Sequence, residues 1–223
     1  MGGFRRHMKF VTLFQGKYFL YMLFFGLVIG IVRAFIADST GSPYGAINDI
    51  NIIMTTVLML MPGNLTMRYL QYQADLCLQM GCTRKNIYLG TFIIILELAA
   101  ESFICYLLLG TVNDYFAANS ADVYTGFADS YMNIFVYLIS ILFMINMGLI
   151  NALMTRRFGN RSIYLTMIIF YVFFIAAVMD EDVISWITGP YAAPIIIFSM
   201  LILLVILLAV PVRNSVKHIV IRA

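Results

Sequence analysis

Long apolar runs alternate along the chain with short polar stretches. A helix needs about 20 predominantly apolar residues to cross the hydrocarbon core of a bilayer. A transmembrane β-barrel would instead alternate apolar and polar residues within strands of about ten, and this sequence does not. The pattern therefore predicts an all-α membrane protein with six transmembrane helices. The expected membrane spans are Tyr18–Ile36, Ile47–Leu65, Ile87–Leu109, Tyr131–Met154, Ser162–Met179 and Tyr191–Val212.

The second span is the least regular of the six. Asn48, Asp49 and Asn51 crowd its start, and Pro62 is followed directly by Gly63. Because proline lacks a backbone N–H and its ring collides with the preceding helical turn, we expect the helix to kink or end at Pro62.

The N-terminal residues 1–17 carry both cations and apolar residues. Phe4, Met8 and Val11 fall on one helical face, and Phe10 and Phe14 fall on a neighbouring face. This spacing favours an amphipathic helix lying in the headgroup layer before the first span. The alternative is a simple positively charged flank of that span.

Charge is scarce and unevenly placed. Charged residues make up 11% of the chain, against about 25% in soluble domains. All the lysines and arginines except Arg33 lie in alternate segments, before the first span, after the sixth and in every second loop. Cytoplasmic segments collect Lys and Arg, so both termini are expected to be cytoplasmic. Topology thus explains the net charge of +3, and no nucleic-acid partner is expected.

The sequence lacks the motifs that are usual for several classes of enzyme. The sequence contains no GxxxxGK[ST], HExxH or GxSxG stretch. Its two histidines, His7 and His218, lie near the termini, and Cys77, Cys82 and Cys105 form no metal-binding pattern. We therefore expect a single transmembrane domain over residues 1–223 that is not an enzyme and holds no metal or cofactor of its own.

The polar segment 68–86 shows an ordered series of signals. Tyr69, Tyr72, Leu76 and Met80 follow the spacing of one helical face. Gly81 suits the left-handed residue that ends many helices, and a Thr83 hydroxyl would cap the next helix. The segment is therefore expected to form a short helix, a sharp stop, a cap and the third span.

These residues carry a resemblance to a known family. Gly81, Thr83, Arg84 and Lys85, followed by "NIYLG" through Gly90, resemble the first cytoplasmic loop of six-span, type-2 ATP-binding cassette (ABC) export permeases, among them bacterial peptide and bacteriocin exporters. The resemblance implies that residues 68–86 form a cytoplasmic coupling loop that docks on a separate ATPase subunit. ATP and Mg²⁺ would bind that partner, and a second permease copy, identical or related, would complete the exporter in the bacterial cell membrane. The implied ATPase-coupling residues are Tyr69, Tyr72, Asp75, Leu76, Met80, Gly81, Thr83, Arg84 and Lys85.

Charged residues also lie inside the spans. Glu97 and Glu101 are four residues apart and so share a helical face. Intramembrane charges usually face a bundle interior or water. Counting about 1.5 Å per residue from Tyr18 and Tyr88 puts Arg33 and Glu101 at similar depth, so we expect them to pair, within one subunit or across a dimer. Glu97 is expected either to be hydrogen-bonded within the bundle or to line a path for a cationic substrate.

The sequence therefore favours an exporter subunit that moves an amphipathic peptide, drug or lipid-like substrate outward. One alternative is an ion-coupled carrier that uses Glu97 and Glu101. A weaker one is an intramembrane enzyme that uses the same carboxylates as acid and base.

Overall fold

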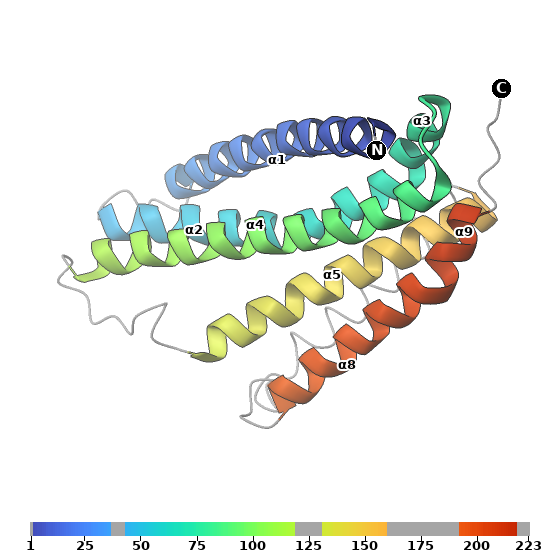
Figure 1. Cartoon of the computed structure of the whole chain (residues 1–223). Helices are drawn as coiled ribbons and strands as arrows, with labels where there is room; N and C mark the ends of the chain where they lie inside the picture. The colour runs from blue at the N-terminus through green and yellow to red at the C-terminus, as the bar shows by residue number, and fades with distance from the viewer. Residues whose placement is uncertain (1, 37–42, 119–130, 160–191, 218–223) are drawn as a thin grey trace.

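The computed structural model describes residues 2–36, 43–118, 131–159 and 192–217, and these residues contain helices and no strands (Figure 1). The helices lie side by side as an elongated bundle, with the start of α1, the short helix α3 and the last helix α9 at one end (Figure 1). Their bounds are α1 Gly2–Ile36, α2 Pro43–Arg68, the π-helical turn η2 Tyr69–Gln73, α3 Ala74–Gln79, α4 Arg84–Ala118, α5 Tyr131–Phe158, α8 Ala192–Leu207, the π-helical turn η3 Leu208–Val212 and α9 Arg213–Lys217.

Five stretches of helix are long and apolar enough to cross a membrane. They cover Val11–Ile36, Gly45–Gln79, Arg84–Phe116, Ile134–Phe158 and Pro194–Lys217. These agree with five of the six spans expected from the sequence. The other expected span, Ser162–Met179, lies outside the described residues, and the cytoplasmic position of the termini stays a prediction.

The N-terminal segment is not a separate helix. Residues from Gly2 continue into the first span as a single helix of 35 residues. Val11 and Gln15 in its first half are buried, so this half packs against the protein, and Arg68 of α2 lies over the Tyr18 ring at 5.1 Å. The segment expected to form the interfacial helix thus continues into the first span without a break, and its position in the headgroup layer stays a prediction.

The helix α2 passes through Pro62 without ending. It continues through Gly63 to Arg68 and then through η2 into α3. Pro62 and Gly63 are both buried, so tertiary packing holds the helix where the local signal predicts a stop or kink. The third span also runs beyond its expected end at Leu109, because α4 extends to Ala118.

The core forms around α2, which packs against α1, α4 and α5, while α8 packs on α5. Polar contacts join the same helices. The Asn51 side-chain amide donates to the Oδ1 atom of Asn113 over 3.0 Å, linking α2 to α4. The Tyr137 hydroxyl donates to the Ser102 backbone oxygen over 3.1 Å, and the Tyr137 ring stacks on Tyr106 at 3.8 Å. Buried polar groups paired in this way fix the rotation of each helix about its axis.

The backbones of α2 and α5 approach each other closely at two glycines. A Cβ atom added at Gly148 would collide with the carbonyl of Gly63 and lie 2.9 Å from the Gly63 Cα. A Cβ at Gly63 would likewise collide with the Met144 carbonyl. Small residues allow such close packing between transmembrane helices, so these two glycines fix how α2 and α5 are aligned.

Replacing Gly148 with Ala should therefore lower thermal stability, with an unfolding cost of about 1–3 kcal/mol, as found for overpacked cores. Gly16→Ala is the matched control, because a Cβ there meets nothing within 4 Å and alanine favours a helix by about 0.5–1 kcal/mol over glycine. Thermal unfolding in detergent measures both variants. Equal stability of Gly148→Ala and wild type would contradict the backbone contact.

Candidate functional site

The candidate site is the helical hairpin of residues 69–86 at one end of the bundle. It contains η2, α3, a tight turn and the start of α4 (Figure 1). The expected order of helix, stop and cap is confirmed. The preceding helix ends at Gln79, Gly81 has a φ of +82°, and the Asn86 N–H donates to the Thr83 hydroxyl over 3.3 Å.

The stop at Gly81 is a Schellman motif, in which two N–H groups beyond the helix bond back to its last carbonyls. The Gly81 N–H donates to the Leu78 oxygen and the Cys82 N–H donates to the Cys77 oxygen, both over 2.9 Å. An apolar contact commonly joins the residues in the Cys77 and Cys82 positions, and both of these side chains are buried thiols. Burial raises the pKa of the Cys82 thiol above its usual value, so Cys82 stays neutral near pH 7, as an apolar contact requires.

Tyr69 anchors the hairpin from inside. Its side chain is completely buried, and its hydroxyl donates to the Ile87 backbone oxygen over 3.2 Å. The Thr91 hydroxyl donates to the same oxygen over 3.0 Å. Tyr69 therefore joins the two arms of the hairpin and does not form part of its outer surface.

The rest of the helical face predicted from the sequence is exposed. Tyr72, Leu76 and Met80 are 62%, 43% and 52% exposed. Thr83, Arg84 and Lys85 are also exposed where the second arm begins. We call these six residues the tip surface. It combines apolar side chains with two cations on a hairpin whose turn is fixed by hydrogen bonds.

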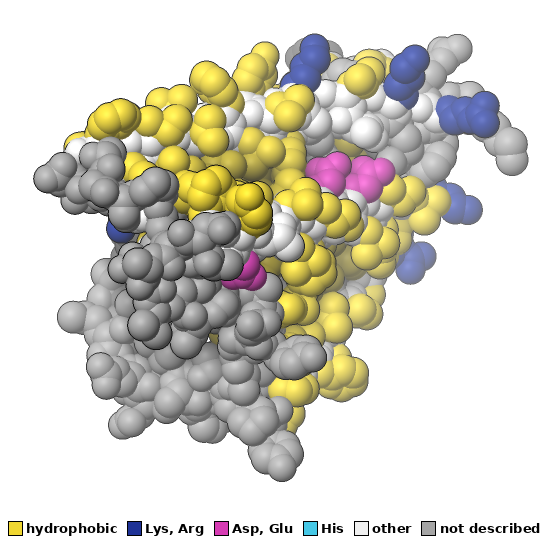
Figure 2. Space-filling model, turned by 90° about the vertical axis from the view of Figure 1, so that its left-hand side faces the viewer, with side chains coloured by type: hydrophobic (Ala, Val, Ile, Leu, Met, Phe, Trp, Pro, Cys, Tyr) yellow, Lys and Arg dark blue, Asp and Glu magenta, His cyan; other side chains and the backbone are white. Residues whose placement is uncertain are grey.

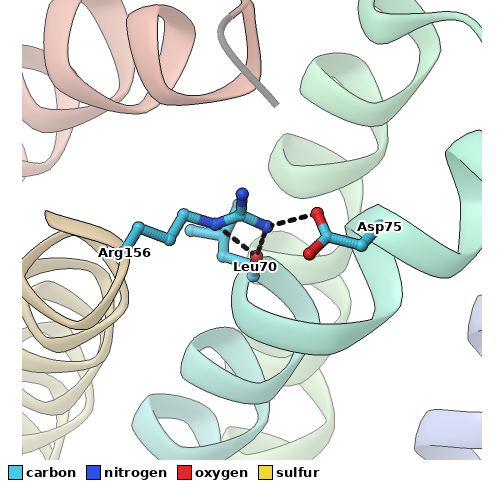
Figure 3. Close-up of polar contacts among 3 residues, drawn as sticks. All are labelled: Leu70, Asp75 and Arg156. Atoms are coloured by element: carbon cyan, nitrogen blue, oxygen red, sulfur yellow. Dashed lines mark hydrogen bonds and ion pairs between the residues drawn. The ribbon is translucent and has the colours of Figure 1, made fainter. Parts of the chain in front are cut away.

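Arg156, near the end of α5, donates hydrogen bonds to the first arm of the hairpin (Figure 3). Its Nε donates to the Leu70 backbone oxygen over 2.9 Å, and one terminal nitrogen donates to the same oxygen. That nitrogen also pairs with the Asp75 carboxylate at 2.9 Å. Asp75 is among the coupling residues expected from the sequence, whereas Arg156 is not. No local sequence signal identifies its role, because the contact joins positions more than 80 residues apart.

The predicted pair of Arg33 and Glu101 does not form within the chain. The Arg33 Nε lies 3.3 Å from the Asp49 carboxylate. Gly30 lies against Ile50, and Asn51 bonds Asn113 on α4. Along the bundle axis, Arg33 therefore lies at the height of Asn113 on α4. Asn113 is about 18 Å along α4 from Glu101, at 1.5 Å per residue. The depth estimate failed because Tyr18, taken as the membrane boundary, is an interior position of a longer helix.

Glu97 and Glu101 lie on the outer side of α4. Glu97 is half-buried and Glu101 is exposed. Leu96, Ile104 and Leu108 near them are 67%, 56% and 60% exposed. Figure 2 shows acidic side chains surrounded by hydrophobic ones on the surface of the molecule. Within the described residues no three His, Cys, Asp or Glu side chains group as metal ligands would.

Comparison with known proteins gives no relative. No protein-family profile matches the chain, and no curated protein or solved structure is significantly similar to it.

The positive φ at Gly81 leads to a graded prediction. A side chain there has open space, since nothing lies within 4 Å of an added Cβ, so strain arises only from the left-handed backbone. Gly81→Val should lower the free energy of unfolding by about 1–2 kcal/mol. Gly81→Asn should cost less, because asparagine tolerates this conformation. Thermal unfolding compares them, and an equal cost for Asn and Val would contradict backbone strain as the cause.

The pair of Arg33 and Asp49 predicts a coupling in a double-mutant cycle. Arg33→Ala and Asp49→Ala together should cost less than the sum of the single changes, by up to about 1 kcal/mol for a pair that is partly exposed. The control cycle combines Arg33→Ala with Glu101→Ala, whose effects should add. Unfolding in detergent measures both cycles, and coupling only in the control would contradict the observed pairing.

Proposed function

We propose that this chain is the membrane-spanning subunit of an exporter driven by a separate ABC ATPase. The observation that carries the proposal is the tip surface. Tyr72 of η2, Leu76 of α3 and Met80 directly after α3 are exposed, and a Schellman motif closes α3. Arg84 and Lys85 stand at its other arm.

The chemistry of this surface suits a protein partner. Tyrosine, methionine and arginine are enriched at protein interfaces, and a preformed surface loses little conformational entropy on binding. The hairpin also continues directly from α2 and into α4. An ATPase bound at the tip surface would therefore act on two membrane spans at once.

A second subunit is part of the proposal. Carboxylates are costly on a surface that faces lipid, yet Glu97 and Glu101 stand on the outer side of α4 among apolar side chains. A second permease copy, identical or related, would cover this side and enclose a polar path between the two. The substrate would then be amphipathic, with a cationic group that matches the carboxylates.

The same carboxylates support a second candidate, an ion-coupled carrier. Acidic residues within membrane spans mark proton and cation pathways in many proteins. In this case the chain would need no ATPase, and Glu97 or Glu101 would bind the coupling ion.

The test is whether the purified full-length chain, in lipid nanodiscs, binds an ABC ATPase from the same genome and raises its ATP turnover. Tyr72→Ala should then weaken binding by about 10- to 30-fold, as loss of a central aromatic contact typically does. The matched control is Tyr115→Ala, which changes a tyrosine of similar exposure, 67% against 62%, on α4. This control should bind normally.

Two results would contradict the exporter function. If the chain alone, in liposomes, moved a solute in an ion gradient and lost this activity on Glu97→Gln or Glu101→Gln, the carrier function would replace the exporter. Unchanged ATP turnover with every ABC ATPase of the genome would also contradict the proposal.

A further inference from the structure

We propose that Arg156 holds Tyr69–Gln73 in its π-helical form and thereby sets the rotation of the tip surface relative to α2. The proposal concerns the conformation of this chain alone. It therefore stands or falls independently of whether an ATPase binds.

The first step is the backbone bonding of η2. The Ala74 N–H donates to the Tyr69 oxygen, five residues back. In an α-helix it would donate to the Leu70 oxygen, four residues back. In the π form the Leu70 backbone oxygen therefore does not receive the Ala74 N–H. The Arg156 guanidinium donates to this oxygen instead.

The second step is the reach of the guanidinium. Arginine has a planar fork of donors that contacts two acceptors at once. Arg156 uses it on Leu70 within η2 and on Asp75 within α3. The side chain thus bridges the junction where the π-helical turn becomes an α-helix (Figure 3).

The third step is that the two glutamine side chains within η2 contribute little to its stability. Gln71 and Gln73 are buried. Neither polar atom of the Gln71 side chain has a hydrogen-bond partner in the described part of the chain, and the side-chain oxygen Oε1 of Gln73 has none there either. Buried polar atoms without partners are unfavourable, and π-helical turns are rare. The segment is thus held from outside, by Arg156 and by the Tyr69 hydroxyl bond to Ile87.

The consequence is geometric. Each residue of an α-helix turns the chain by about 100° and advances it by about 1.5 Å. If η2 became α-helical at the same length, α3 would rotate by about 100° relative to α2. Leu76 and Met80 would then face a different direction, although neither residue had changed.

The experiment measures a distance in the full-length chain. Spin-labelled amino acids are introduced genetically at Lys9 of α1 and Leu76 of α3, both exposed, so the native cysteines stay in place. Arg156→Ala should shift the mean distance between labels by several ångströms. Arg157→Ala is the matched control, because this neighbouring arginine lies over Phe158, and it should leave the distance unchanged. An unchanged distance in folded Arg156→Ala protein would overturn the proposal.

A deletion gives a second, independent readout. Tyr72 is the exposed residue of η2, while the other four are buried. Without Tyr72 the segment can close as an α-helix while α3 keeps its position. Deleting Tyr72 should therefore restore the wild-type distance in Arg156→Ala protein, which loss of a merely stabilising contact would not produce. If Arg156→Ala fails to fold, the deletion alone decides: a wild-type distance supports the proposal, and a shifted one overturns it.

Discussion

The structure depends on the backbone contact between Gly63 of α2 and Gly148 of α5. Because neither residue has a side chain, the helices approach until main-chain atoms meet, and this fixes their axial alignment. Leu70 lies seven residues beyond Gly63, and Arg156 lies eight beyond Gly148. At 1.5 Å per residue these are about 10 and about 12 Å along the two helices. The glycine contact therefore brings Arg156 beside the Leu70 carbonyl, to which it donates hydrogen bonds.

The hairpin combines two kinds of constraint. Its turn is determined locally, by the left-handed Gly81, the Thr83 cap and the two backbone hydrogen bonds of the Schellman motif. Its attachment is determined at long range, by Tyr69 bonding across to Ile87 and by Arg156 reaching from α5. The local bonds give the tip surface its shape, and the distant ones give it its direction. A partner that displaced the surface would therefore act on α2, α4 and α5 together.

The local features could be predicted from the sequence, because they depend on residues close together along the chain. Five membrane spans, the stop at Gly81 and the cap at Thr83 follow from apolar runs and from rules for helix ends. The features that could not be predicted depend on how helices align. Arg33 pairs with Asp49 because α1 is longer and packs deeper than a count from Tyr18 allows. The role of Arg156 requires a π-helical turn that no residue pattern indicates.

The position of Pro62 gives α2 a further property. Proline removes one bond of the helical ladder, directly beside the glycine that is pinned against α5. The helix α2 therefore bends most easily at the position where it is packed against α5. From Gly63 the helical path runs about 24 Å to Gln79 and about 21 Å to Asp49, at 1.5 Å per residue. Because α2 lacks one helical hydrogen bond at Pro62, a displacement of the hairpin would bend the helix there instead of passing rigidly to the Arg33–Asp49 pair.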